Sequence, residues 1–120
     1  MNEFHEAVII GAGPAGLTAG IYLMRAGIDA VLIEKALLGG TPMNYDHVEN
    51  YPGFPEGVSS KELMQKMAEQ ARRFGLSLKE FAEVDEVTCQ GDRFIVRAGG
   101  DSMESLGVIV CTGTVSIKIG

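Results

Sequence analysis

The sequence predicts an α/β fold, a doubly wound parallel sheet with a small antiparallel meander inserted before its last strand. Two short apolar runs, residues 7–10 and 30–33, have the pattern of strands that are buried on both faces of a parallel sheet. A helical segment, residues 17–26, separates them, so that residues 6–34 form one strand–helix–strand unit of the usual length, about 30 residues. With 120 residues, the chain is expected to form one domain with its own core.

Local signals mark where two helices begin and end. Pro14 fits the first turn of the first helix, where a backbone N–H would have no partner, and Gly27 fits its end. Ser59, with Glu62 three residues later, predicts a capping box at the start of a second helix, which Gly75 ends. One apolar face of this second helix is formed by Leu63, Met67, Ala71 and Phe74.

The second half of the chain is predicted to be mostly strand. Residues 76–84 are expected to form a third strand, residues 86–97 a hairpin, and residues 101–106 a further short arm. Residues 108–111 then form a fourth buried strand. Residues 37–55 are predicted to be a loop, because Gly and Pro recur along them, and a loop this long in a compact domain is typically functional or disordered.

Composition excludes several classes of protein. The net charge of −6 leaves no basic face to neutralise the phosphates of a nucleic acid, so we expect no nucleic-acid partner. The apolar runs are too short to span a bilayer, and the N-terminus has no basic leader, so we expect a cytoplasmic protein without membrane contact.

The cysteine and histidine residues give no sign of a catalytic or metal site. Cys89 and Cys111 have neither metal-type nor redox-type spacing, which predicts two reduced thiols packed in or near the core. His5 precedes the first strand and His47 falls in the long loop, so both are expected to be solvated. No residue of the chain is predicted to be catalytic.

A glycine-rich segment joins the first strand to the first helix. Gly11, Gly13 and Gly16 form the pattern Gly-x-Gly-x-x-Gly, a weak signal alone that gains weight here because it follows a buried strand and opens a helix. The first glycine permits a tight turn, the second lets a pyrophosphate approach the backbone, and the third lets helix and sheet pack closely. Free N–H groups and the partial positive charge of the helix start favour phosphate. The segment predicts a Rossmann-like, dinucleotide-binding fold.

An acidic residue completes this pattern. Glu34 ends the second strand, 23 residues after Gly11. A carboxylate at this place accepts hydrogen bonds from the ribose hydroxyls of a dinucleotide and repels a 2′-phosphate, which disfavours NADP. FAD and NAD stay open on this reasoning, because both contain the same ADP half.

Over nearly its whole length, the sequence resembles the first FAD-binding segment of the low-molecular-weight thioredoxin reductases, which are flavoprotein pyridine nucleotide–disulfide oxidoreductases. The resemblance is carried, in order, by residues 11–20 (GAGPAGLTAG), 39–40 (GG), 48–57 (VENYPGFPEG), 62–71 (ELMQKMAEQA) and 112–113 (TG). Residues 48–57 are the most specific, since nicotinamide-binding Rossmann domains have no such element. The resemblance therefore implies FAD as the cofactor.

The resemblance also implies which residues hold the cofactor. These are Gly11, Gly13, Pro14, Ala15 and Gly16 at the pyrophosphate; Glu34 and Lys35 at the adenosine ribose; Gly39, Gly40 and Thr41 along the ribityl chain and flavin; Asn50 at the isoalloxazine ring; Val84 at the adenine, through its backbone; and Thr112 and Gly113 over the cofactor at the end of their strand. Two positions depart from the family's pattern. Thr41 stands where the family commonly has Gln, which weakens the assignment of a flavin contact to this residue, and Cys111 stands where Ala is common, a change of packing.

Parts that the resemblance leads one to expect are missing from the chain. Thioredoxin reductases of this kind pass electrons from NADPH through FAD to a disulfide, and they use a second glycine fingerprint, a Cys-x-x-Cys pair and a C-terminal FAD segment. The sequence has one fingerprint and no Cys-x-x-Cys. We therefore expect residues 1–120 to be the first segment of an FAD-binding domain, without the NADPH domain and the C-terminal FAD segment, that is inactive alone.

An exposed sheet edge is expected to follow from this. Without a further strand beside it, the strand at residues 108–111 becomes an apolar edge that can pair with another chain. We expect a homodimer or a strand-exchanged assembly that covers it.

Three other functions stay open. A ferredoxin- or flavodoxin-linked NADP reductase has a similar architecture and lacks the Cys pair. An NAD-binding domain of a dehydrogenase is the second, and residues 50–53 argue against it. The third is a non-enzymatic nucleotide-binding or interaction module.

Overall fold

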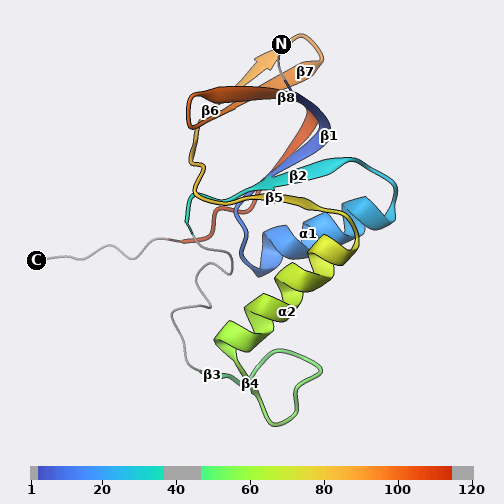
Figure 1. Cartoon of the computed structure of the whole chain (residues 1–120), viewed down its shortest axis with the longest axis vertical. Coiled ribbons are helices and arrows are strands. Elements are labelled where there is room, and N and C mark those ends of the chain that lie inside the picture. Colours follow the sequence, from blue (N-terminus) through green and yellow to red (C-terminus); the bar gives the residue numbers. More distant parts are fainter. Residues whose placement is uncertain (1–2, 37–46, 115–120) are drawn as a thin grey trace, which may run out of the picture.

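The computed structural model of the chain describes residues 3–36 and 47–114, and Figure 1 shows its elements. In chain order they are β1 (Glu3–Ile10), α1 (Pro14–Arg25), β2 (Ala30–Ile33), β3 (His47–Val48), β4 (Val58–Ser59), α2 (Ser60–Arg73), β5 (Ser77–Lys79), β6 (Val84–Gln90), β7 (Arg93–Ala98) and β8 (Asp101–Val110). Six strands form one sheet in the order β5-β2-β1-β8-β7-β6. Strands β5, β2, β1 and β8 are mutually parallel, whereas β7 is antiparallel to both β8 and β6. The predicted α/β class, with its inserted antiparallel meander, is confirmed.

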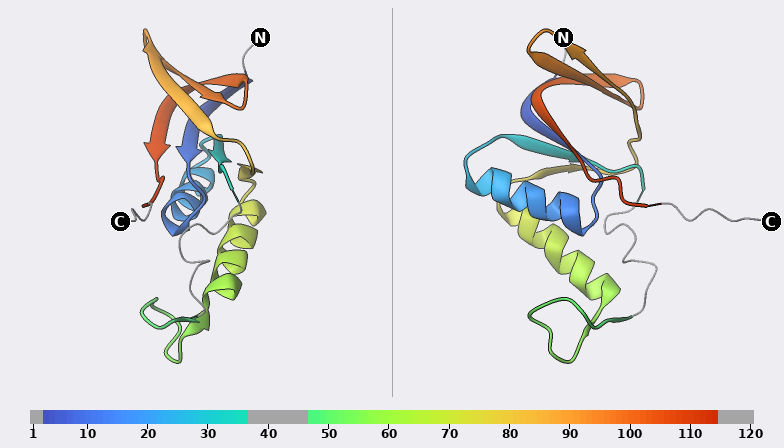
Figure 2. Two further views of the ribbon diagram at one scale, coloured as in Figure 1. Left: turned by 90° about the vertical axis from the view of Figure 1, so that its left-hand side faces the viewer. Right: turned by 180° about the vertical axis from the view of Figure 1, so that it is seen from behind.

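The sheet separates two apolar cores. Helices α1 and α2 lie side by side on one face of the sheet, as Figure 2 shows. Alternate residues of a strand point to opposite faces. The sheet residues that pack with the helices are Ala7, Ile9, Ala30 and Leu32. The intervening residues Val8, Val31 and Ile33 pack on the other face with Val96, Ala98 and Met103 of the meander.

The predicted helices are confirmed, and their ends follow local chemistry. Pro14 occupies the first turn of α1, and the backbone of Gly27 has a positive φ of 78° just after the helix. The Ser59 hydroxyl caps α2 by accepting the N–H of Glu62 at 3.3 Å. The predicted apolar face of α2 is buried at Leu63, Met67 and Ala71, but Phe74 is 39% exposed because it lies beyond the last turn.

Three strand predictions need correction. The third strand is only Ser77–Lys79, because Phe81 adopts a positive φ of 57° that turns the chain out of the sheet. The arm predicted at 101–106 and the strand predicted at 108–111 are one continuous strand, β8. The glycine between them, Gly107, does not have a positive φ, so it does not break the strand.

The predicted loop at residues 37–55 contains a strand, and the last strand is less buried than expected. His47–Val48 pairs with Val58–Ser59 in a separate two-stranded sheet, a pairing too short to leave a periodic pattern. The end of β8 is only partly buried, and Val110 is 68% exposed, because β7 covers only the first half of this strand. No helix in the described part of the chain is both long and apolar enough to cross a membrane.

Candidate functional site

The predicted phosphate loop lies between the end of β1 and the start of α1. Gly11 has a φ of +107°, and a Cβ there would collide with the carbonyl oxygen of Cys111, just after β8. A Cβ on Gly16 would collide with the carbonyl oxygen of Gly11 and would lie 3.4 Å from Cγ2 of Ile9. The first and third glycines are therefore required by the packing of the chain itself.

Gly13 differs from these two glycines. Its φ of −80° and ψ of −168° are extended values that an L-residue adopts, and a Cβ there would meet no atom within 4 Å. It is also the N-cap of α1, with no side chain to cap the helix. Nothing in the fold of the described residues requires a glycine here, and the space in front of it is open.

Backbone amides at the start of α1 have no backbone acceptor among the residues that the structure describes. The first hydrogen bond of the helix runs from the Leu17 N–H to the Gly13 carbonyl at 3.0 Å. Pro14 has no N–H. Within the described chain, the N–H groups of Gly13, Ala15 and Gly16 have no backbone acceptor. These donors and the partial positive charge of the helix start form a site for an anion.

Glu34 lies beside the same loop and is 9% exposed. Its Oε1 accepts the N–H of Ala12 at 2.9 Å, and its Oε2 accepts the N–H of Ala36 at 2.8 Å. Its backbone is held as well, since the Glu34 N–H donates to the Lys79 carbonyl at 2.8 Å and the Ala82 N–H donates to the Glu34 carbonyl at 3.0 Å. The sequence pattern predicted the place of this carboxylate but not its backbone partners.

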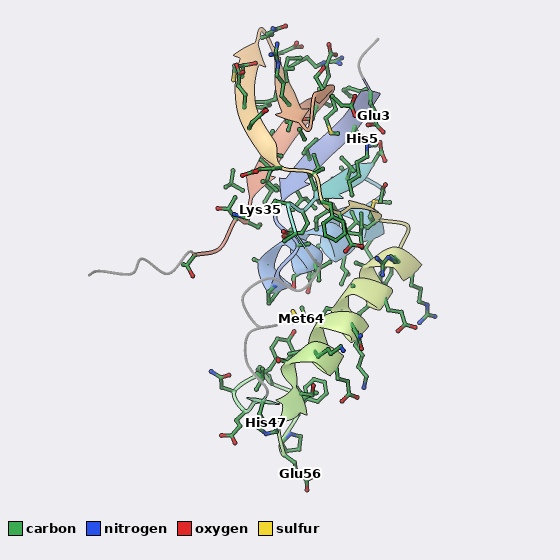
Figure 3. All side chains as sticks on the ribbon, turned by 60° about the vertical axis from the view of Figure 1, so that its left-hand side comes forward. Glu3, His5, Lys35, His47, Glu56 and Met64 are labelled. Atoms are coloured by element: carbon green, nitrogen blue, oxygen red, sulfur yellow. The ribbon has the colours of Figure 1, made fainter. Side chains whose placement is uncertain are left out.

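The carboxyl ends of β1, β2 and β8 meet at this loop. The Gly11 N–H donates to the Ile33 carbonyl at 2.9 Å, and the Cys111 N–H donates to the Ile10 carbonyl at 2.8 Å. Thr112 and Gly113, which follow Cys111, are exposed at this end of the sheet. Lys35 is exposed at the same end, whereas Glu3 and His5 lie at the opposite end, as Figure 3 shows. The structure thus brings the predicted residues of the glycine loop, the end of β2 and the end of β8 together.

Other predicted residues lie elsewhere or outside the described chain. Asn50 is exposed on the loop between β3 and β4. This loop lies at the start of α2, away from the large sheet, near His47 and Glu56 (Figure 3). This loop surrounds an open depression of about 340 Å³, in which the Tyr51 and Phe54 rings lie 6.2 Å apart. Val84, which begins β6, is partly buried two residues after Ala82. Gly39, Gly40 and Thr41 lie outside the described residues.

Two predictions about histidine and cysteine were wrong. The His5 side chain is only 14% exposed, because its Nδ1 lies 3.0 Å from Asp29 Oδ2 and its Nε2 lies 3.1 Å from Glu3 Oε1. A hydrogen bond from Lys79, with a smaller contribution from His5, lowers the pKa of Glu3. Cys89 is an exposed free thiol on β6, whereas Cys111 is partly buried against the helix-side core as predicted.

His47 is half exposed, with Glu49 Oε1 3.8 Å from its Nε2. In the described part of the chain, no group of three or more His, Cys, Asp or Glu residues is placed to hold a metal ion.

Comparison with known proteins identifies the family. The model of the pyridine nucleotide-disulphide oxidoreductases matches residues 5–120. The chain belongs to this family. It is 40% identical to the thioredoxin reductase of Mycolicibacterium smegmatis, over 97% of this chain and 37% of that protein. It is 38% identical to the thioredoxin reductase of Bacillus subtilis strain 168, over 99% of this chain and 37% of that protein. A crystal structure of the thioredoxin reductase of T. acidophilum superposes with a TM-score of 0.93 at 30% identity, over 99% of this chain and 38% of that one. The chain therefore spans little more than a third of the length of these three relatives.

Proposed function

We propose that this chain binds the ADP half of FAD and is the first FAD-binding segment of a thioredoxin-reductase-like flavoprotein. The observation that carries the proposal is Gly13, because the fold needs Gly11 and Gly16 for its own packing but leaves the second glycine unexplained. A pyrophosphate in the open space would explain it, since the phosphate could then reach the N–H groups of Gly13, Ala15 and Gly16.

The remaining predicted contacts are part of the same proposal. Glu34 and Lys35 would meet the adenosine ribose, and Thr112 and Gly113 would pass over the cofactor. Gly39, Gly40 and Thr41 would follow the ribityl chain, Asn50 would meet the flavin, and Val84 the adenine. FAD, when bound, supplies electron transfer between a nicotinamide and a disulfide. The chain's own residues would bind and orient it, and NADPH would be bound by parts of the parent enzyme that lie outside this sequence.

The chain's two cysteines do not serve as the redox pair of this proposal. Cys89 on β6 pairs with Phe94 of β7, which in turn pairs with Ser105 of β8, and Cys111 lies six positions after Ser105. The two free thiols are therefore two strands apart across the sheet and about six residues apart along it. A dithiol that exchanges electrons with a flavin needs two sulfurs close enough to form a bond. We therefore propose that the chain alone binds FAD without reducing a disulfide.

Titration with FAD tests this proposal. Purified protein is stripped of nucleotide and mixed with FAD, and the absorbance that stays with the protein after gel filtration is measured. We expect bound flavin with a dissociation constant in the micromolar range or weaker, on the order of −8 kcal/mol, because residues 1–120 supply only part of the site. ADP should compete for this site. Protein that binds NADH and no FAD would indicate a dehydrogenase domain, and protein that binds neither would indicate a non-enzymatic module.

We also propose that the chain forms a homodimer through the second half of β8, which among the described residues has a partner strand on one side only. β7 pairs with β8 only as far as Ser105, whereas β1 pairs with it up to Val110. The Cys111 N–H points to β1, so the backbone groups of Leu106, Val108 and Val110 point to the uncovered side. A second copy fits this edge, because antiparallel pairing centred on Val108 sets Leu106 of each copy opposite Val110 of the other. These two side chains are 50% and 68% exposed.

A charge on the edge should dissociate this dimer. Val110→Lys places an ammonium group on an apolar strand edge, a change that opposes edge-to-edge pairing. The matched control is Tyr22→Lys, since Tyr22 on α1 is also 68% exposed. Sedimentation at micromolar concentration should give a dimer for the parent chain and the control and a monomer for Val110→Lys. A parent chain that sediments as a monomer would refute the assembly.

A further inference from the structure

Glu34 uses its side chain in a way that its predicted role at the ribose does not require. Both carboxylate oxygens accept backbone N–H groups, from Ala12 within the glycine loop and from Ala36 just after β2. The Ala12 hydrogen bond is buried, and it joins residues that are 22 positions apart in sequence. A hydrogen bond with an ionised acceptor is shorter and stronger than a neutral one. The carboxylate therefore fixes the position of the glycine loop before any ligand is present.

We propose that Glu34 is a positioning residue for the phosphate-binding loop, in addition to its contact with the ribose. The inference rests on the proposed binding of an adenine dinucleotide. Glu34 acts on the pyrophosphate through Ala12: its Oε1 turns the Ala12 N–H toward itself. The loop is thereby held so that the N–H groups of Gly13, Ala15 and Gly16 are left for the phosphates.

The carboxylate has the capacity for both tasks. An ionised carboxylate offers about four acceptor positions on its two oxygens. The two backbone N–H groups occupy one position on each oxygen, and one position on each stays available for the two ribose hydroxyls. The two donated N–H groups also offset the negative charge that Glu34 would otherwise present to the nearby phosphates.

A carboxamide cannot replace this arrangement. The side chain introduced by Glu34→Gln would keep one acceptor oxygen, but its NH₂ group would face the N–H of either Ala12 or Ala36, and two donors cannot bond to each other. One of these N–H groups would lose its acceptor. If it is the Ala12 N–H, the glycine loop loses its hydrogen bond to the end of β2. If it is the Ala36 N–H, the side chain at position 34 loses the second hydrogen bond that holds it in place.

The test compares the Glu34→Gln variant with the parent chain on two ligands, ADP and 2′,3′-dideoxy-ADP, by calorimetry. The dideoxy ligand has no ribose hydroxyls, so the ribose contact contributes nothing to its affinity. If Glu34 positions the loop, Glu34→Gln weakens the dideoxy ligand about tenfold, as expected for a lost hydrogen bond to a charged group. If Glu34 serves the ribose alone, the variant and the parent chain bind the dideoxy ligand equally, and the proposal is overturned.

Glu6→Gln is the matched control. Glu6 lies on β1, and its Oε1 also accepts a backbone N–H, that of Asp29, at 3.1 Å. This contact is at the start of β2, away from the glycine loop. The variant should bind both ligands as the parent chain does. A parent chain that binds neither ADP nor the dideoxy ligand would overturn the proposed function itself, a result distinct from the loss of the loop contact.

Amide exchange provides a measurement on the unmodified protein, should Glu34→Gln fail to fold. The Ala12 N–H should already be protected from exchange without ligand, while the N–H groups of Gly13, Ala15 and Gly16 exchange quickly. Addition of inorganic pyrophosphate should then shift the amide signals of these three residues and leave Ala12 nearly unchanged. An Ala12 N–H that is unprotected until ligand binds would overturn the proposal.

Discussion

Gly13→Asp is expected to abolish FAD and ADP binding while the chain stays folded. The new carboxylate would stand where the pyrophosphate is proposed to lie. Two unit charges at about 4 Å repel each other by about 4 kcal/mol at an effective dielectric constant of 20, which corresponds to about a thousandfold loss of affinity. The same carboxylate would also take the N–H groups that serve the phosphates. Calorimetry with ADP measures the loss directly.

The fold should tolerate this substitution for reasons that are local to Gly13. A side chain there has open space and an ordinary backbone conformation. Asp is also a favoured N-cap residue, and a negative charge stabilises a helix start, so we expect the free energy of unfolding to change by no more than about 1 kcal/mol. Circular dichroism and urea denaturation verify this point.

Ser59→Asp is the matched control for this experiment. It places the same residue at the N-cap of the other helix, where Ser59 already accepts the Glu62 N–H. It should leave both stability and ADP affinity close to those of the parent chain. If Gly13→Asp bound ADP as well as Ser59→Asp does, the anion site would not be at the start of α1.

The phosphate loop could be predicted from the sequence because its chemistry is local. A buried strand, three glycines and a helix follow each other within residues 7–26, and this order of elements marks the loop without reference to any other part of the chain. Glu34 could be placed because the strand–helix–strand unit has a nearly fixed length. The Ser59 cap of α2 is local in the same sense, since donor and acceptor are three residues apart.

Features that depend on distant pairing could not be predicted in this way. Ala12 and Ala36 offer only backbone groups to Glu34, so no side chain in the sequence marks them as partners. The burial of His5 depends on Asp29, which the turn after α1 brings beside β1. The exposure of Val110 depends on how far β7 extends along β8, and that length is set by the register of the meander.

The pairing of β3 with β4, which sets His47 opposite Ser59, could not be predicted from the sequence either. Two residues on each strand are too few for alternation to be visible in sequence, and the turn residues between them predict only a loop. Asn50 could therefore be assigned to the flavin by resemblance. Nothing in the sequence predicted that its loop lies at the start of α2, away from the large sheet.

Gly16→Ala is expected to destabilise the whole fold. The Cβ of the new alanine would collide with the carbonyl oxygen of Gly11. Gly11 cannot move away easily, because its N–H donates a hydrogen bond to the Ile33 carbonyl and its positive φ fixes the turn. Ile9 behind it is fully buried. Overpacking of this kind costs about 3 kcal/mol or more. This outweighs the roughly 1 kcal/mol by which Ala is favoured over Gly in a helix. Melting temperature should fall by roughly 10 °C.

Gly107→Ala is the matched substitution, and the contrast between the two variants is the test. Like Gly16, Gly107 lies in a regular element, the strand β8, which pairs with β1. A Cβ at Gly107 would meet nothing within 4 Å, and its φ is not positive. Replacing it should leave stability unchanged or raise it by about 0.5 kcal/mol, because Ala lowers the entropy of the unfolded chain. Thermal unfolding of both variants separates close packing at Gly16 from a general cost of losing glycine. Equal melting temperatures for the two would mean that α1 can move away from β1, and that the third glycine, like the second, is present for the ligand and not for the fold.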